Sequence, residues 1–172
     1  KRRRNEKMEI EKKFLKKNID NLDLGKYEKK HITQDYLYKD KYTAIRKRMI
    51  VKDNKVRYVY TVKTKATGIS AHEIENEISR EEYDSLRINA NFNTIDKIRY
   101  VIPYKNGLKI ELDVFNGCYK GIIFAEIEFE SEEQAKNTEL PDWFGNELSC
   151  KLTNSDMAVK DVGEIFNIIK NM

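Results

Sequence analysis

Residues 108–115, LKIELDVF, alternate apolar and charged side chains with a period of two residues as far as position 114. Successive side chains of a strand point to opposite faces of a sheet, so Glu111 and Asp113 share one face, and Ile110, Leu112 and Val114 share the other. This segment is therefore predicted to be an amphipathic strand.

The same alternation recurs along the chain in short segments bounded by polar, Gly or Asn clusters, and it predicts eight strands. Their predicted ranges are 8–15, 31–38, 43–51, 56–65, 72–78, 94–103, 108–115 and 123–130. Eight strands are enough to close a small barrel. The pair Asn106-Gly107 between the sixth and seventh predicted strands favours a type I′ hairpin turn.

Three helices are expected outside the strands, over residues 80–89, 131–137 and 161–170. Ser79 is the candidate N-cap of the first, with Glu82 completing a capping box. The last carries apolar residues at helical spacing and is expected to pack on the barrel.

Composition indicates one folded domain over residues 1–172, with residues 1–7 disordered or loosely ordered. Charged residues make up 36% of the chain, but 40% are apolar, which is too many for a disordered protein. The 33 basic and 29 acidic residues nearly balance, so the net charge of +4 does not indicate nucleic acid.

Cys118 and Cys150 have no zinc-site spacing and are expected to be reduced thiols. No run approaches the roughly 18 apolar residues of a membrane span, and no apolar signal core follows the basic start. We therefore expect a cytoplasmic protein with no membrane partner.

Charges on the polar strand faces are sorted by sign. The acidic sets are Glu9 with Glu11, Glu73 with Glu75, Glu111 with Asp113, and Glu126 with Glu128; the basic sets are Arg46 with Arg48, Lys63 with Lys65, and Lys97 with Arg99. A single solvated sheet face would explain any one strand. It does not explain the repetition, because like charges about 4 Å apart repel by roughly 4 kcal/mol at an effective dielectric near 20. An enclosed site holding a metal ion and a polyanion would compensate both sets.

Oxygen-only ligands favour Mg²⁺ or Mn²⁺, and Mg²⁺ commonly binds about one or two carboxylates, with water and substrate phosphates completing its shell. Arginine and lysine side chains are suited to binding those phosphates, arginine through its forked donors. One face of the predicted sheet therefore has both halves of a metal and polyphosphate site.

Residues 9–13, EIEKK, resemble the ExExK motif of the CYTH superfamily, also called triphosphate tunnel metalloenzymes. Further motifs follow in the family's order. Residues 34–37 resemble its QxYL, 45–48 its RxR strand, 61–63 its TxK strand, 73–75 its ExE, 97–100 its KxRY, 111–115 its ELDVF and 125–129 its VEVEF. With the segments around residues 143–145 and 154–158, the resemblance covers residues 8 to 158.

The resemblance implies a mainly β (α+β) fold, an eight-stranded antiparallel β-barrel tunnel with a few flanking helices. A small bacterial tripolyphosphatase-like member would hydrolyse inorganic tripolyphosphate to pyrophosphate and phosphate with one or two divalent cations. The implied metal ligands are Glu9, Glu11, Glu126 and Glu128, with Glu111 and Asp113 as further metal-binding or water-orienting acids. The implied substrate-binding residues are Lys13, Arg46, Arg48, Lys63, Lys97 and Arg99. The implied catalytic residues are Tyr36, Lys63, Glu73 and Glu75, and a pairing of Tyr36 with Lys63 is linked in the family to preference for tripolyphosphate.

Two departures from the family pattern bear on the substrate. Ala71 stands where many relatives have Arg, and Leu152 stands where Tyr is common, in a loop that looks shortened over residues 149–154. Three alternatives to the inorganic triphosphatase therefore stay open: a thiamine triphosphatase, a class IV type adenylate cyclase, and a polyphosphate-binding module without turnover. The expected partner is inorganic triphosphate or a triphosphate-bearing small molecule, on a monomer or homodimer.

Overall fold

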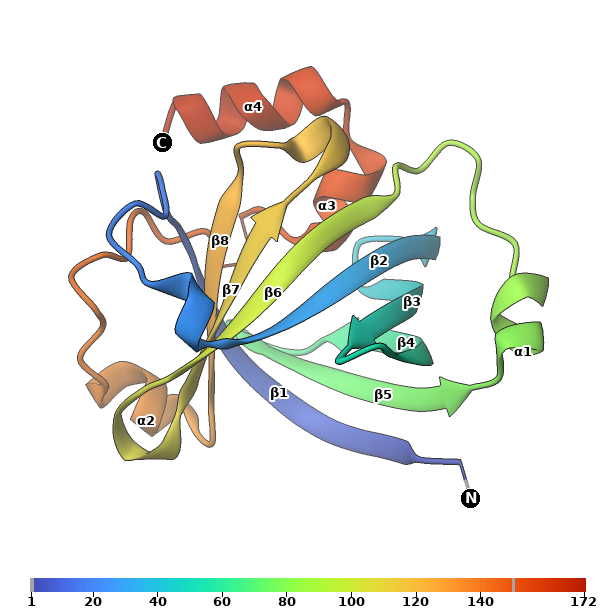
Figure 1. Ribbon diagram of the computed structural model, residues 1–172, viewed down its shortest axis with the longest axis horizontal. Coiled ribbons are helices and arrows are strands. Elements are labelled where there is room, and N and C mark those ends of the chain that lie inside the picture. The colour runs from blue at the N-terminus through green and yellow to red at the C-terminus, as the bar shows by residue number, and fades with distance from the viewer. Residues whose placement is uncertain (1, 150) are drawn as a thin grey trace.

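The computed structural model describes residues 2–149 and 151–172, and within them eight antiparallel strands close into a barrel (Figure 1). The strands are β1 (Arg4–Leu15), β2 (Glu28–Lys39), β3 (Thr43–Lys52), β4 (Lys55–Lys65), β5 (Ser70–Ile78), β6 (Ile95–Pro103), β7 (Lys109–Phe115) and β8 (Ile123–Phe129). Their order around the barrel is β1-β5-β4-β3-β2-β6-β7-β8, and β8 pairs with β1 to close it. The predicted barrel class is confirmed.

Helices and short 3₁₀ turns connect and cover the strands. The helices are α1 (Arg80–Ser85), α2 (Glu132–Asn137), α3 (Asn154–Val159) and α4 (Val162–Lys170), and the 3₁₀ turns are η1 (Leu24–Lys26), η2 (Lys105–Gly107) and η3 (Gly117–Tyr119). None of the described helices is both long enough and apolar enough to cross a bilayer.

Several element boundaries differ from the sequence prediction. Strand β1 begins at Arg4, so residues 4–7, expected to be loosely ordered, are paired with β5. The capping box of Ser79 and Glu82 is present, but α1 ends at Ser85 rather than at residue 89. Beyond it the backbone N–H of Asn91 donates to the side chain of Asn89, a local bond that competes with helix formation.

Helix α3 was not predicted. It has six residues, too few to show a helical period, and its start is fixed by a capping box between Thr153 and Asp156. At the predicted hairpin turn, Asn106 and Gly107 both have positive φ, 55° and 72°, as a type I′ turn requires. Cys118 is a free, exposed cysteine, and Cys150 lies outside the described residues.

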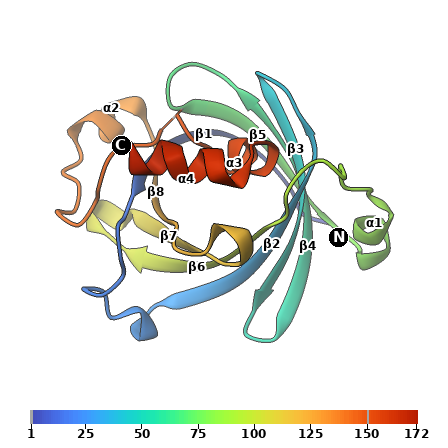
Figure 2. The ribbon, with the colours of Figure 1, turned by 90° about the horizontal axis from the view of Figure 1, so that it is seen from above.

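One end of the barrel is covered by α3 and α4, which lie across it in Figure 2. At this end the inward positions change from charged to apolar: Leu15 follows Lys13 on β1, and Phe124 precedes Glu126 on β8. These side chains pack with Met157 of α3 and the other members of a buried cluster. The apolar plug therefore closes one end of a barrel whose remaining interior is charged.

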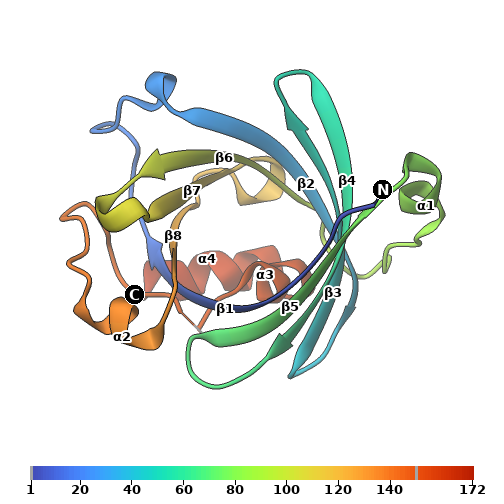
Figure 3. The ribbon, with the colours of Figure 1, turned by 90° about the horizontal axis from the view of Figure 1, so that it is seen from below.

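A second apolar cluster lies on the outer face of β1, β7 and β8, beneath α2 and the segments that flank it (Figure 3). Phe14 packs on Phe144 with ring centroids 4.7 Å apart, and Phe144 packs on Trp143. With the outer face buried here, the charged residues of these strands can only point inward.

Candidate active site

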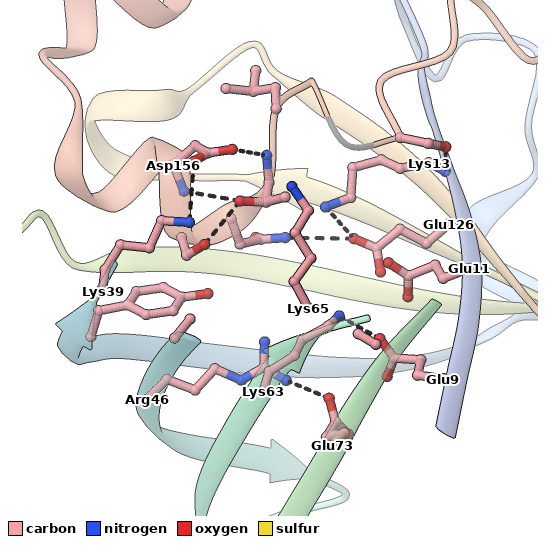
Figure 4. A pocket seen from close by; sticks show the side chains of 18 of the residues that line it. Glu9, Glu11, Lys13, Lys39, Arg46, Lys63, Lys65, Glu73, Glu126 and Asp156 are labelled. Atoms are coloured by element: carbon pink, nitrogen blue, oxygen red, sulfur yellow. Dashed lines mark hydrogen bonds and ion pairs between the residues drawn. The ribbon is translucent and has the colours of Figure 1, made fainter. Parts of the chain in front are cut away.

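The barrel encloses a cavity of about 840 Å³, lined by inward-facing side chains of the strands and by the segment that leads into α3 (Figure 4). Fourteen of the fifteen residues predicted from the sequence to form the site line this cavity. They are Glu9, Glu11, Lys13, Tyr36, Arg46, Arg48, Lys63, Glu73, Glu75, Lys97, Arg99, Glu111, Glu126 and Glu128. The exception is Asp113, which lies behind the cavity wall with no exposed surface.

The cavity is more basic than the protein as a whole. Its lining includes 14 Lys and Arg side chains and 9 Asp and Glu side chains, an excess of five positive charges. The whole chain carries a net charge of only +4. The lining therefore carries more excess positive charge than the whole chain, whose other residues sum to a net charge of −1, and a concave site charged in this way attracts anions.

Strand register brings the acidic and basic sets together as ion pairs. Lys63 on β4 pairs with Glu9 on β1, and Lys13 on β1 lies 3.2 Å from Glu126 on β8. Lys7 donates to Glu128 at 2.8 Å. The two sets therefore compensate each other in part by ion pairs across the barrel, so a metal ion and a polyanion are not the only source of compensation.

Strands β6 and β7 hold the most buried of these pairs. Lys97, 1% exposed, donates to Asp113 Oδ2 at 2.7 Å and to Asn154 Oδ1 at 3.1 Å. Arg99 binds Asp113 through Nε and Nη2, and its Nη1 donates to Glu111 at 2.7 Å. Burial lowers the pKa of Lys97 to about 8, although Asp113 opposes the shift. Burial would raise the pKa of Asp113, but Arg99 and Lys97 hold it below its ordinary value.

The opposite wall, on β2 to β5, is built around two arginines. Arg48 Nη2 donates to Glu75 at 2.7 Å, while Arg46 Nη2 lies 3.6 Å from Glu73. Burial and the neighbouring Arg46 lower the pKa of Arg48 to about 10. Burial raises the pKa of Glu73, against the opposing effect of Arg46. Glu73 is thus a carboxylate whose affinity for a proton is increased.

Tyr36 is 2% exposed and its phenol oxygen accepts a 2.7 Å hydrogen bond from Gln34 Nε2. It is the register partner of Arg46, which is in turn the partner of Thr61 on β4. Lys63 therefore lies diagonally beyond Arg46, and within the described residues its ammonium is paired with Glu9, without a hydrogen bond to Tyr36. The pairing of Tyr36 with Lys63 stays a prediction.

Within the described chain, every buried side-chain polar atom that lacks a hydrogen-bond partner lies on this same wall. The atoms are Gln34 Oε1, Arg46 Nε, Arg48 Nε, Thr61 Oγ1 and Glu73 Oε2. Buried polar groups without partners are costly, and they concentrate where a ligand or ordered water supplies the missing bonds. Both donors and acceptors are represented, so this wall suits phosphate oxygens together with water.

Four carboxylates occupy neighbouring positions on β1 and β8. Glu11 is the direct register partner of Glu128, and Glu126 is the partner of Lys13, two residues along β1. Burial and the nearby Glu126 raise the pKa of Glu11 well above its ordinary value. No ion pair or hydrogen bond engages the Glu11 carboxylate within the described part of the chain.

A divalent cation would supply the positive countercharge that the Glu11 carboxylate lacks. The oxygen-only donor set of Glu9, Glu11, Glu126 and Glu128 fits Mg²⁺ or Mn²⁺ in chemical type. Among the described residues, however, no three acidic, His or Cys side chains are already arranged to hold a metal ion. Glu9, Glu126 and Glu128 are each turned toward a lysine instead.

Sequence reasoning missed several residues that line the cavity, including Lys7, Lys39 and Asn154. Lys7 continues the inward positions of β1 into a segment expected to be loose. Lys39 faces inward because the β2–β3 register shifts between Tyr36 and Tyr38, and it lies 3.3 Å from Asp156 of α3. A period-two pattern cannot reveal such a shift.

The two departures from the family pattern both fall at the cavity. Ala71 is 8% exposed and faces the cavity from β5, opposite Lys65 on β4. Leu152 is fully buried and belongs to the apolar plug, although it also borders the cavity.

No family model matches the chain. Comparison with curated proteins and solved structures finds similar inorganic triphosphatases. The chain is 35% identical over 117 residues to an inorganic triphosphatase of Acetivibrio thermocellus, an alignment that covers 67% of this chain and 70% of that protein. It is 33% identical over 92 residues to an inorganic triphosphatase of Nitrosomonas europaea, covering 54% of this chain and 60% of the relative. The solved structure of the inorganic triphosphatase NE1496 superposes with a TM-score of 0.59 and 26% identity, over 89% of this chain and 95% of that one.

Proposed function

The chain belongs to the inorganic triphosphatases of the CYTH superfamily, and on that premise we propose that it hydrolyses inorganic tripolyphosphate to pyrophosphate and phosphate in a metal-dependent reaction. The observation that carries the proposal is the basic cavity, in which six Lys and Arg side chains predicted to bind substrate meet a neighbouring carboxylate set. A compact polyanion carries the negative charge that complements the excess positive charge of this cavity.

Substrate binding in this cavity is an exchange of partners. Lys13 and Lys63 are already paired with Glu126 and Glu9, so a phosphate must compete with those carboxylates for the ammonium groups. Each exchange frees a carboxylate on β1 or β8. Glu9 and Glu126 become available beside the unpaired Glu11 as the substrate binds, which favours joint binding of anion and cation.

Glu9, Glu11, Glu126 and Glu128 would hold the cation. A bound Mg²⁺ or Mn²⁺ would neutralise phosphate charge and lower the pKa of a water molecule. Arg46 and Arg48 lie beside their carboxylate partners and would present guanidinium N–H donors to phosphate oxygens. Arg99 has most of its N–H donors engaged by Asp113, Glu111 and Glu126, and contributes mainly its positive charge.

Glu73 and Tyr36 complete the proposed chemistry. Glu73 has a raised pKa and a buried oxygen without a hydrogen bond, so it can accept the proton of an attacking water. The water oxygen forms a bond to a terminal phosphorus, and the bond from that phosphorus to the bridging oxygen breaks in line with it. Since the Tyr36 oxygen already accepts from Gln34, its hydroxyl proton is free to donate to a phosphate oxygen.

The test is phosphate release from tripolyphosphate, pyrophosphate, ATP and thiamine triphosphate, each with Mg²⁺, Mn²⁺ or a chelator. We expect tripolyphosphate to be the preferred substrate, with turnover lost in the chelator and in Glu11→Gln. Equal turnover in the chelator would refute the metal dependence. Preference for ATP or thiamine triphosphate would move the protein to one of the other enzyme classes on this fold, and binding without turnover would indicate a polyphosphate-binding module.

A further inference from the structure

Lys65 is a cavity cation that the proposed reaction does not use. It is the last residue of β4, and its side chain extends into the cavity between the walls formed by β1 and by α3 (Figure 4). No hydrogen bond or ion pair engages its ammonium within the described part of the chain. Lys63, two residues earlier on the same face, is by contrast paired with Glu9.

The space around Lys65 is open because the residue opposite it on β5 is small. Its register partner on β5 is Ala71, and the partner of Ala71 on β1 is Glu9. Only a methyl group therefore separates Lys65 from Glu9 across three strands, a span of roughly 10 Å at about 4.8 Å per strand. A larger side chain at position 71 would fill this space.

The absence of a carboxylate partner gives Lys65 a different energetic role from its neighbours. A phosphate that binds Lys13 or Lys63 must first displace Glu126 or Glu9, and the gain is reduced by the pair that is lost. A phosphate that binds Lys65 displaces only water. Lys65 is exposed, so a charge-assisted hydrogen bond formed there competes with water, but no existing ion pair has to be broken to form it.

The position of Lys65 along β4 relates it to the length of the substrate. Two residues on one face of a strand are roughly 7 Å apart. An anion already bound by Arg46 and Lys63 therefore needs a further phosphate group to contact Lys65. A diphosphate held at the first two residues would leave Lys65 without a ligand.

We propose that Lys65 binds the end phosphate of the substrate and is the residue that selects triphosphate over diphosphate. The proposal rests on the proposed function for the identity of the anion. It concerns affinity, so Lys65 is a specificity-determining residue and takes no part in bond breaking.

The experiment compares Lys65→Gln with Lys55→Gln, which removes the same charge from the exposed other end of β4. Binding of tripolyphosphate and of pyrophosphate is measured by calorimetry without divalent metal, and KM and kcat are measured with it. We expect Lys65→Gln to weaken tripolyphosphate binding and raise KM about tenfold, the loss of one charge-assisted bond, with kcat and pyrophosphate binding within about twofold. Lys65→Arg should restore most of the affinity, and Lys55→Gln should behave like the wild type.

The outcomes separate this proposal from the proposed function. If Lys65→Gln leaves tripolyphosphate affinity unchanged, or weakens both anions equally, the role of Lys65 is refuted even when hydrolysis is normal. If the wild type binds tripolyphosphate without hydrolysing it and Lys65→Gln weakens that binding selectively, the proposed function fails and the role of Lys65 stands. A wild type that neither binds nor hydrolyses tripolyphosphate overturns both.

Discussion

Arg99 binds Asp113 through two parallel hydrogen bonds, 2.7 Å from Nε to Oδ1 and 2.8 Å from Nη2 to Oδ2. Lys97 donates to the same Oδ2 at 2.7 Å, so both oxygens of this fully buried carboxylate are occupied. Asp113 on β7 therefore holds Lys97 and Arg99 of β6 in place. Glu111, also on β7, borders the cavity.

Replacing Asp113 should destabilise the protein strongly. Asp113→Asn removes the negative charge that neutralises Lys97 and Arg99, and breaking a buried ion pair by removing one partner costs about 3–5 kcal/mol. We expect the free energy of unfolding, measured by urea denaturation, to fall by that order.

Glu111→Gln is the matched control, since the Glu111 side chain is 29% exposed and shares Arg99 with other acids. Its effect on stability should stay below about 1 kcal/mol. Equal and small effects of both variants would show that Asp113 is not the anchor of these cations.

Glu11→Gln should separate stability from activity. The Glu11 carboxylate is crowded by Glu126 and its pKa is raised, so its ionisation opposes folding when no metal is present. Because the folded form holds the proton more tightly, the stability contributed by Glu11 is present at low pH and is lost as pH rises through the raised pKa. At pH 7 in a chelator, Glu11→Gln should therefore raise the melting temperature, while abolishing turnover.

The gain should disappear near pH 4, where the wild-type carboxyl is also protonated. Adding Mn²⁺ should raise the melting temperature of the wild type and not that of the variant, because the variant lacks the unpaired ligand. A melting temperature for Glu11→Gln below that of the wild type at pH 7 would contradict this account of Glu11.

The buried Lys97 should make the free energy of unfolding depend on pH in the alkaline range. Burial lowers its pKa to about 8, below the ordinary 10.5, so between these values the unfolded chain binds more protons and stability rises with pH. The stability difference between wild type and Lys97→Met should therefore shift toward the wild type by roughly 2 kcal/mol between pH 7.5 and 9.5. Urea denaturation at the two pH values measures it, and a difference that does not vary with pH would refute the shift.

The alternation of side chains was enough to predict the barrel and most of its lining, since side-chain parity in a strand decides which face a residue joins. Glu9 and Glu126 were placed correctly for that reason. Parity failed at Lys39, where the register shift in β2 reverses it. Side-chain parity also could not predict which residues form ion pairs, because the pair of Lys63 with Glu9 depends on a strand order that brings β4 near β1.

Gly145→Ala should test how the chain after α2 holds β1. A Cβ at position 145 would lie 2.4 Å from the Leu15 carbonyl oxygen, which accepts the Gly145 N–H at 2.7 Å. Leu148 N–H likewise donates to Lys13 O, so displacing this segment disturbs the strand that carries Lys13. Overpacking of this kind costs about 1–3 kcal/mol, and we expect that loss in urea denaturation together with a higher KM. Gly25→Ala, whose nearest contact would be 3.8 Å, should change neither. Wild-type stability in Gly145→Ala would mean that this segment is not held against β1.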